Sequence, residues 1–135
     1  MKLLLDTHIA IWTIINSEKL PKHIIDDIEN YDNEIFVSMA SIWEIAIKSA
    51  KSKDKIDLNE KTFVEYITKM DFSILPIKFR HIANLRKLKV NNEKIVHKDP
   101  FDRMLISQAE MEEMLFITKD EKIANYKYEK IKIIE

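Results

Sequence analysis

Short apolar runs alternate with amphipathic segments along the whole chain, and this alternation limits the fold more than any other feature. Residues 2–5, 34–37, 72–77, 115–118 and 131–134 are typical of buried strands, although Pro76 indicates an end or an edge for the third. Helical spacing of apolar residues predicts helices near residues 7–15, 21–29, 38–50, 60–70, 78–88 and 100–114. We therefore expect a parallel sheet covered by helices on both faces.

The composition excludes several classes of protein. With 135 residues, 46% of them hydrophobic, the chain is long enough to bury a core, and one domain over residues 1–135 is expected. The absence of cysteine excludes disulfides, thiolate metal sites and cysteine nucleophiles, which fits a cytoplasmic protein. The absence of glycine excludes the glycine-rich phosphate loops of nucleotide sites. No stretch approaches the roughly 18 apolar residues of a membrane helix, so a soluble protein is expected.

Five acidic residues stand at the ends of the predicted strands or at the starts of the predicted helices. They are Asp6, Glu44, Asp99, Asp102 and Asp120. In an open parallel sheet, ligands bind beyond the carboxyl ends of the strands, so these side chains are expected to converge. Converging carboxylates repel one another unless they are protonated or neutralised, and oxygen ligands suit a hard cation such as Mg²⁺ or Mn²⁺.

Each acid also has an explanation that needs no metal. Asp6 would begin a turn, and Glu44 would pair with Lys48 four residues later. Asp99 is placed to cap the helix that follows it, and Asp102 to complement that helix's dipole. The joint placement of the acids, more than any one of them, favours a metal site.

Several polar residues lie close to the acids in sequence. Thr7 is expected to cap the first helix, while Ser38 and Thr118 are placed to hydrogen-bond carboxylates or bound water, with capping the plainer role for Ser38. His97 is expected to orient or contact the substrate, because an all-oxygen site needs no imidazole.

A local excess of positive charge adds to this pattern. The formal net charge is −1, yet residues 78–103 hold eight Lys or Arg and three acids. A basic surface beside an acidic pocket indicates phosphodiester chemistry, although the same residues would serve equally to solvate a helix.

Four segments in series resemble the PIN-domain family, in particular the VapC-type toxins of bacterial and archaeal toxin-antitoxin pairs. They are Leu-Leu-Asp-Thr-His at 4–8, Ser-Met-Ala-Ser-Ile-Trp-Glu-Ile-Ala-Ile-Lys at 38–48, His-Lys-Asp-Pro-Phe-Asp-Arg-Met-Leu-Ile-Ser-Gln-Ala at 97–109, and Thr-Lys-Asp at 118–120. The resemblance covers nearly the whole chain. It implies a three-layer α/β/α fold with a short, mainly parallel central sheet.

The same resemblance implies an Mg²⁺- or Mn²⁺-dependent endoribonuclease in which a metal-activated water attacks an RNA phosphodiester. The implied catalytic and metal-binding residues are Asp6, Glu44, Asp102 and Asp120, with Asp99 as a further ligand; Asp102 is favoured as the principal third acid. Lys48 and Arg103 are the nearest candidates for steadying the phosphate. A homodimer is implied, together with a cognate antitoxin whose C-terminal segment enters the groove.

Three other functions compete with this reading. A phosphatase with an aspartyl nucleophile needs a second Asp two residues after the first, where this chain has His8. A receiver-like phospho-acceptor domain needs adjacent acids after the first strand. A catalytically silent PIN module would bind RNA without cutting it, and only activity separates it from the nuclease.

Overall fold

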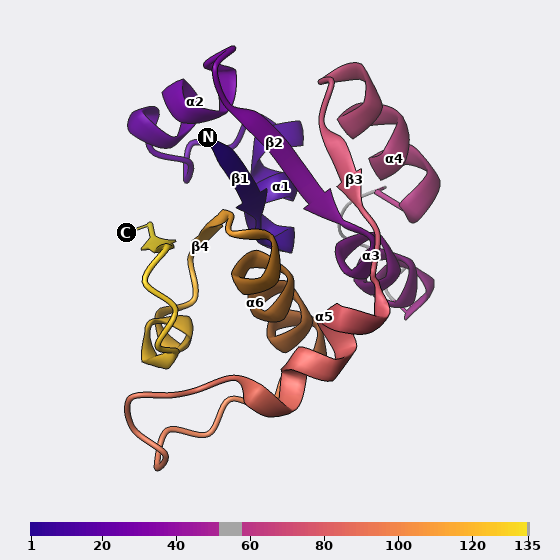
Figure 1. Cartoon of the computed structure of the whole chain (residues 1–135). Coiled ribbons are helices and arrows are strands. Elements are labelled where there is room, and N and C mark those ends of the chain that lie inside the picture. The colour runs from indigo at the N-terminus through magenta and orange to yellow at the C-terminus, as the bar shows by residue number, and fades with distance from the viewer. Residues whose placement is uncertain (52–57, 135) are drawn as a thin grey trace.

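Five short strands form one parallel sheet at the centre of the molecule (Figure 1). The computed structural model describes residues 1–51 and 58–134, so the charged break predicted at residues 51–55 lies mostly outside them. The strands are β1 (Lys2–Leu5), β2 (Glu34–Ser38), β3 (Ser73–Leu75), β4 (Leu115–Thr118) and β5 (Ile131–Ile133). Their order is β3-β2-β1-β4-β5, and all neighbours run parallel.

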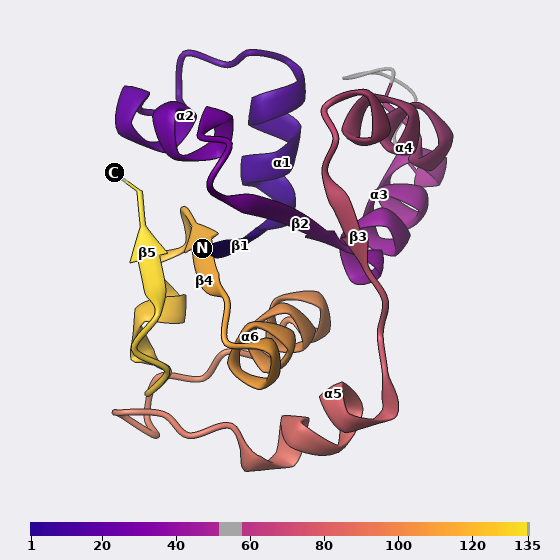
Figure 2. The ribbon, with the colours of Figure 1, turned by 45° about the horizontal axis from the view of Figure 1, so that its top comes forward.

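Helices cover both faces of this sheet. They are α1 (Thr7–Ile14), α2 (Lys22–Glu29), α3 (Met39–Lys51), α4 (Glu60–Lys69), α5 (Phe79–Ala83) and α6 (Pro100–Glu112), with the 3₁₀ helices η1 (Asn84–Lys87) and η2 (Glu121–Asn125). Figure 2 shows α1 and α2 on one side of the sheet and α6, backed by α5, on the other. The three-layer α/β/α prediction is confirmed.

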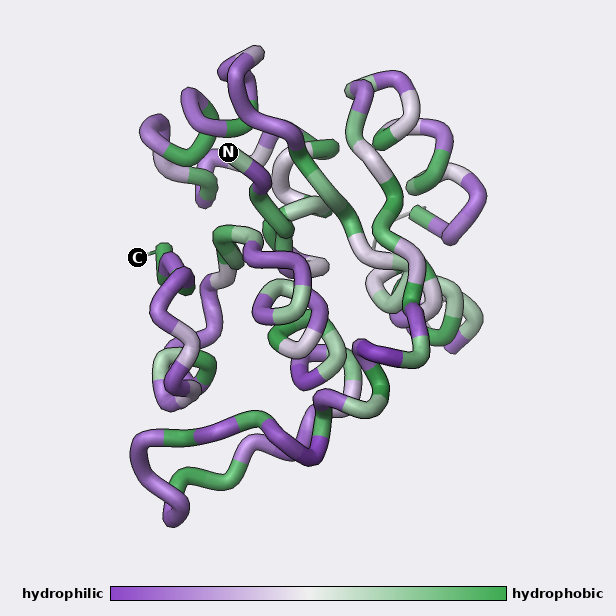
Figure 3. Tube along the Cα trace, viewed as in Figure 1, coloured by the Kyte–Doolittle hydropathy of each residue, from purple (hydrophilic) through white to green (hydrophobic). Residues whose placement is uncertain are grey.

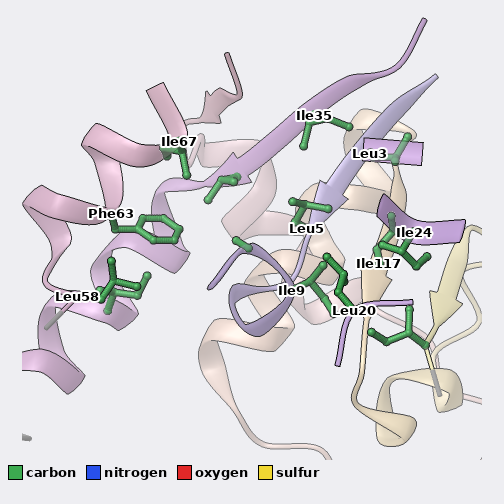
Figure 4. Packing of buried hydrophobic residues seen from close by; sticks show 14 residues of the cluster. Leu3, Leu5, Ile9, Leu20, Ile24, Ile35, Leu58, Phe63, Ile67 and Ile117 are labelled. Atoms are coloured by element: carbon green, nitrogen blue, oxygen red, sulfur yellow. The ribbon is translucent and has the colours of Figure 1, made fainter. Parts of the chain in front are cut away.

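Strand β1 shows why the apolar runs become central strands. Leu3, Leu4 and Leu5 are all fully buried. Successive side chains of a strand point to opposite faces. Leu3 and Leu5 join the cluster under α1 to α4 (Figure 4), while Leu4 joins the cluster under α6. Each such side chain stabilises the fold by about 1.5–3 kcal/mol. Hydrophobic residues accordingly lie on the central strands as well as on the helices that cover them (Figure 3).

Two local predictions were wrong. Asp6, and not Thr7, caps α1: its Oδ1 accepts the Thr7 N–H at 2.7 Å. The helix predicted at residues 78–88 divides into α5 and η1. Buried His81 lies near this division, where its Nδ1 accepts the Lys78 N–H and its Nε2 lies 2.8 Å from Glu112 Oε2. These contacts tie the segment to α6, and tertiary contacts override the local helical pattern.

Other boundaries agree with the sequence. Ser38, one of two predicted caps for α3, accepts the Ala40 N–H through its Oγ. Strand β3 ends at Leu75, directly before Pro76. No helix within residues 1–51 and 58–134 has the length and apolar character needed to cross a bilayer.

Because the chain lacks glycine, other residues take the left-handed backbone conformation that turns require. Asn16, Asp71 and Glu113 have φ of 54°, 63° and 56°. Asn and Asp tolerate this region better than most residues, whereas Glu113, which ends α6, has no such advantage.

Glu113→Gly should therefore raise the free energy of unfolding by about 1 kcal/mol, because glycine has no Cβ to strain. Urea unfolding measures the change. The matched control is Glu65→Gly within α4, which should lower stability by about 1 kcal/mol. Equal losses in both variants would contradict the strain at Glu113.

Candidate metal centre

An open cavity of about 500 Å³ lies where β1 and β4 end and where α3 and α6 pass. All five predicted acids line it. The lining residues are Asp6, His8, Glu44, Lys48, Asp99, Asp102, Lys119, Asp120, Glu121 and Lys122. Residues distant in sequence thus meet at the carboxyl edge of the sheet.

Asp6 is fixed at the end of β1 by hydrogen bonds to both carboxylate oxygens. Oδ1 accepts the Thr7 N–H, and Oδ2 accepts the Thr118 hydroxyl at 2.5 Å from the adjacent strand β4. The side chain is buried, and burial raises its pKa above the ordinary value while the Thr118 hydrogen bond opposes that rise. The Asp6 carboxylate is therefore held in one position and is poorly solvated.

Glu44 is buried and held between a hydroxyl and an ammonium group. Its Oε1 lies 2.7 Å from Thr7 Oγ1, and its Oε2 lies 2.7 Å from Lys48 Nζ. Thr7 Oγ1 also lies 2.8 Å from Ser41 Oγ. A hydroxyl has one proton, so Thr7 donates to the carboxylate and accepts from Ser41. Bonding to Glu44 raises the pKa of Lys48.

Asp99 and Asp102 make different contacts at the start of α6. Asp99 is the N-cap, because its Oδ1 accepts the N–H groups of Phe101 and Asp102 at 2.9 and 3.1 Å. Asp102 has no capping duty; its Oδ2 lies 3.3 Å from His97 Nε2. Burial, followed by the charges of neighbouring acids, raises the pKa of Asp102 to about 8. Removing or balancing that negative charge would stabilise the site.

Asp120 follows β4 and is linked to Asp6 through Thr118. The Asp120 N–H donates to Thr118 Oγ1 at 3.1 Å, and the same hydroxyl donates to Asp6. Asp120 Oδ1 caps η2 by accepting the Lys122 N–H at 3.0 Å, which leaves Oδ2 near His97 Nε2, 3.7 Å away. Thr118 therefore couples the positions of two of the acids.

Five predicted site residues are not among those that line the cavity: Thr7, Ser38, His97, Arg103 and Thr118. Thr7, Thr118 and His97 contact acids that do line it. Ser38 is fully buried, and its hydroxyl donates to Gln108 Oε1. The Arg103 guanidinium donates to the Leu85 carbonyl and to the Tyr126 hydroxyl, both at 3.1 Å. These contacts organise the structure around α6 and direct Arg103 to an internal partner.

His97, predicted from the sequence to orient or contact the substrate, lies beside Asp102 and Asp120. One donor atom each from His97, Asp102 and Asp120 lie within 4.8 Å of one another. Sequence reasoning missed Tyr126, whose hydroxyl lies 3.0 Å from His97 Nδ1, and the cavity lysines Lys119 and Lys122. The only available signal was that both lysines flank Asp120.

The donor set fits a divalent cation. Carboxylate oxygens suit Mg²⁺ and Mn²⁺, and several of them here lie close enough to disfavour one another's ionisation. A cation in the cavity would remove that repulsion and would be held by groups already fixed by Thr7, Thr118 and the N-terminus of α6.

Comparison with known families supplies the deciding observation: the family model for the PIN domain matches residues 3–128. The chain belongs to the PIN domain family. The matched part of this PIN domain includes all five acids of the cavity. No curated protein matches the sequence.

Solved structures share the PIN fold at low sequence identity. VapBC2 from Rickettsia felis, bound to a promoter DNA fragment, contains a chain with TM-score 0.76 and 17% identity, with 100% of both chains covered. A toxin-antitoxin complex from Klebsiella pneumoniae gives 0.61 and 15%, covering 96% of this chain and 95% of the other. FitAcB from Neisseria gonorrhoeae gives 0.56 and 16%, covering 87% of each. At these identities the likeness shows the fold.

Asp102→Asn should stabilise the metal-free protein, and more at pH 8 than at pH 5. The unfolded carboxyl titrates near pH 3.8 and the folded one near 8, so between these values only the folded state keeps the proton and wild-type stability falls as pH rises. The asparagine cannot ionise. We expect a gain of about 1–3 kcal/mol at pH 8 in urea unfolding with EDTA.

Exposed Asp26 on α2 provides the control, because Asp26→Asn should change stability little at either pH. A gain for Asp102→Asn that is independent of pH, or a loss at pH 8, would contradict the repulsion between the cavity acids.

Proposed function

We propose that this PIN domain is a metal-dependent endoribonuclease and acts as the toxin of a type II toxin-antitoxin pair. The observation that carries the proposal is the convergence of five carboxylates on one open cavity in a chain of this family. Such a cavity offers oxygen ligands to Mg²⁺ or Mn²⁺ and leaves room for a substrate.

The proposed cation ligands are Asp6, Glu44, Asp99, Asp102 and Asp120. When bound, the cation would acidify a water molecule and offset negative charge on the scissile phosphate. The protein's own contribution is orientation. Thr118 and the Thr7 N–H hold Asp6, and the Thr7 hydroxyl holds Glu44. Four of the five acids are fixed by backbone or hydroxyl donors before any substrate arrives.

Positive side chains at the cavity are suited to an RNA backbone. Lys48, Lys119 and Lys122 line the same cavity as the acids, and the Lys48 side chain is 63% exposed although it pairs with Glu44. A lysine in this position can attract a phosphate without leaving its helix. We assign Lys48 to substrate binding and give Arg103, held by Tyr126 and Leu85, a positioning role.

The toxin role is supported by the structural neighbour from Klebsiella pneumoniae, which is described as a toxin-antitoxin complex. We propose a cognate antitoxin, a homodimer and a cytoplasmic location for this protein. Trp43, adjacent to Glu44 and edge-on to Phe101 at 5.1 Å, is 60% exposed. A large aromatic side chain left exposed at the rim of an acidic cavity is consistent with a protein partner there.

Asp6→Asn should abolish RNA cleavage while the protein remains folded. The variant keeps a side chain that hydrogen-bonds but loses a negatively charged cation ligand, so we expect at least a roughly 100-fold loss of rate. Cleavage of a labelled RNA pool, with Mg²⁺ and with EDTA, measures it. The matched control, Asp26→Asn, should cleave at the wild-type rate.

Expression in cells tests the toxin role separately. The wild type should arrest growth and Asp6→Asn should not, and co-expression of the adjacent antitoxin gene should relieve the arrest. Wild-type RNA binding without cleavage would instead indicate a silent RNA-binding module, and undiminished cleavage in EDTA would refute the metal mechanism.

A further inference from the structure

We propose that His97 is a direct nitrogen ligand of the cation, so that the site contains both nitrogen and oxygen ligands and prefers transition-metal ions over Mg²⁺. This inference deepens the proposed function and rests on it for the presence of a cation. It assigns to His97 Nε2 a role distinct from the substrate contact expected from the sequence.

His97 Nε2 lies close to the carboxylates of Asp102 and Asp120. It lies 3.3 Å from Asp102 Oδ2 and 3.7 Å from Asp120 Oδ2. Neighbouring ligands of an octahedral ion, each about 2.1 Å from the metal, lie roughly 3 Å apart. The three donor atoms lie within 4.8 Å of one another and are therefore close enough to bind one ion, with Asp102 and Asp120 approaching from α6 and from the end of β4.

The His97 side chain is largely buried, and its Nε2 faces the two carboxylates. Only 6% of the side chain is exposed, and Nε2 contacts the carboxylates of Asp102 and Asp120. The separation from Asp102 exceeds the usual 2.7–3.2 Å of an N–H···O bond. An imidazole nitrogen directed at two carboxylates, with all three donor atoms close together, can join those carboxylates in binding one cation.

Contacts on the Nδ1 side hold the His97 imidazole ring in place. His97 Nδ1 lies 3.0 Å from the Tyr126 hydroxyl, and the two rings pack edge to face with centroids 5.7 Å apart. Arg103 donates to the same hydroxyl and to the Leu85 carbonyl. Metal-binding histidines commonly donate their second ring nitrogen to a fixed partner, which leaves a lone pair on the first. When Nδ1 donates its proton to the Tyr126 hydroxyl, Nε2 directs its lone pair toward Asp102 and Asp120, where a cation would lie.

The consequence is metal preference. Mg²⁺ binds oxygen almost exclusively, whereas imidazole adds affinity for later divalent ions such as Co²⁺ and Ni²⁺ and is also accepted by Mn²⁺. The chain should therefore bind Co²⁺ more tightly than Mg²⁺, and that difference should depend on His97.

Calorimetry on the full chain with Co²⁺ and with Mg²⁺ tests this preference. His97→Asn should weaken Co²⁺ binding at least about tenfold and change Mg²⁺ binding less than about twofold. The matched control is His23→Asn, on the exposed face of α2, which should alter neither. Equal weakening of both ions, or unchanged Co²⁺ binding, would overturn the proposal.

Pulsed electron paramagnetic resonance of the bound Mn²⁺ gives a direct readout of the ligand atom. The wild type should show nitrogen coupling that His97→Asn loses and that Tyr126→Phe, which keeps the imidazole, retains. If one variant does not fold, the wild-type spectrum alone still tests the proposal. Wild-type protein that binds Mn²⁺ without nitrogen coupling, or that does not bind Mn²⁺, contradicts the proposal.

These measurements do not depend on RNA cleavage. Nitrogen coupling in a protein that cuts no RNA would support the His97 ligand and refute the nuclease. Metal-dependent cleavage without nitrogen coupling would do the reverse.

Discussion

Repulsion among carboxylates at one edge of the sheet is the constraint on which the functional site depends. The protein supplies donors to four of the acids: Thr118 to Asp6, Thr7 and Lys48 to Glu44, and backbone N–H groups to Asp99 and Asp120. Asp102 lacks such support, and its pKa rises to about 8. The unbalanced negative charge lies where a cation would neutralise it. The repulsion between carboxylates that destabilises the metal-free protein is therefore the same repulsion that favours metal binding.

The parallel sheet makes this arrangement possible. β1 and β4 are neighbours in register, with Leu5 opposite Ile117, and the residues that follow them, Asp6 and Thr118, therefore meet. A shift by one residue would move every side chain of a strand to the opposite face, so the observed register decides which side chains meet at the end of the sheet. The apolar core thus fixes the positions of the polar side chains at the carboxyl ends of these strands.

The strands, most helices and the acidic cluster could be predicted because each leaves a local pattern: an apolar run, a helical spacing or an acid directly after a strand. The division of residues 78–88 could not, since it follows from His81 contacting Glu112. The directions of His97 and Arg103 also depend on distant groups, Tyr126 and the Leu85 carbonyl. Sequence spacing contains no information about such pairs, whereas Asp99 showed its capping role through the proline that follows it.

The most direct test of the account is a crystal structure of the protein with Mn²⁺, in which anomalous scattering locates the ion. We predict an anomalous peak inside the cavity, within bonding distance of Asp102 and at least one of Asp6, Glu44 and Asp120, and its disappearance in Asp6→Asn crystals or its weakening there. An empty cavity at saturating Mn²⁺, or an ion bound only elsewhere on the surface, would contradict the claim that these carboxylates are gathered to hold a cation.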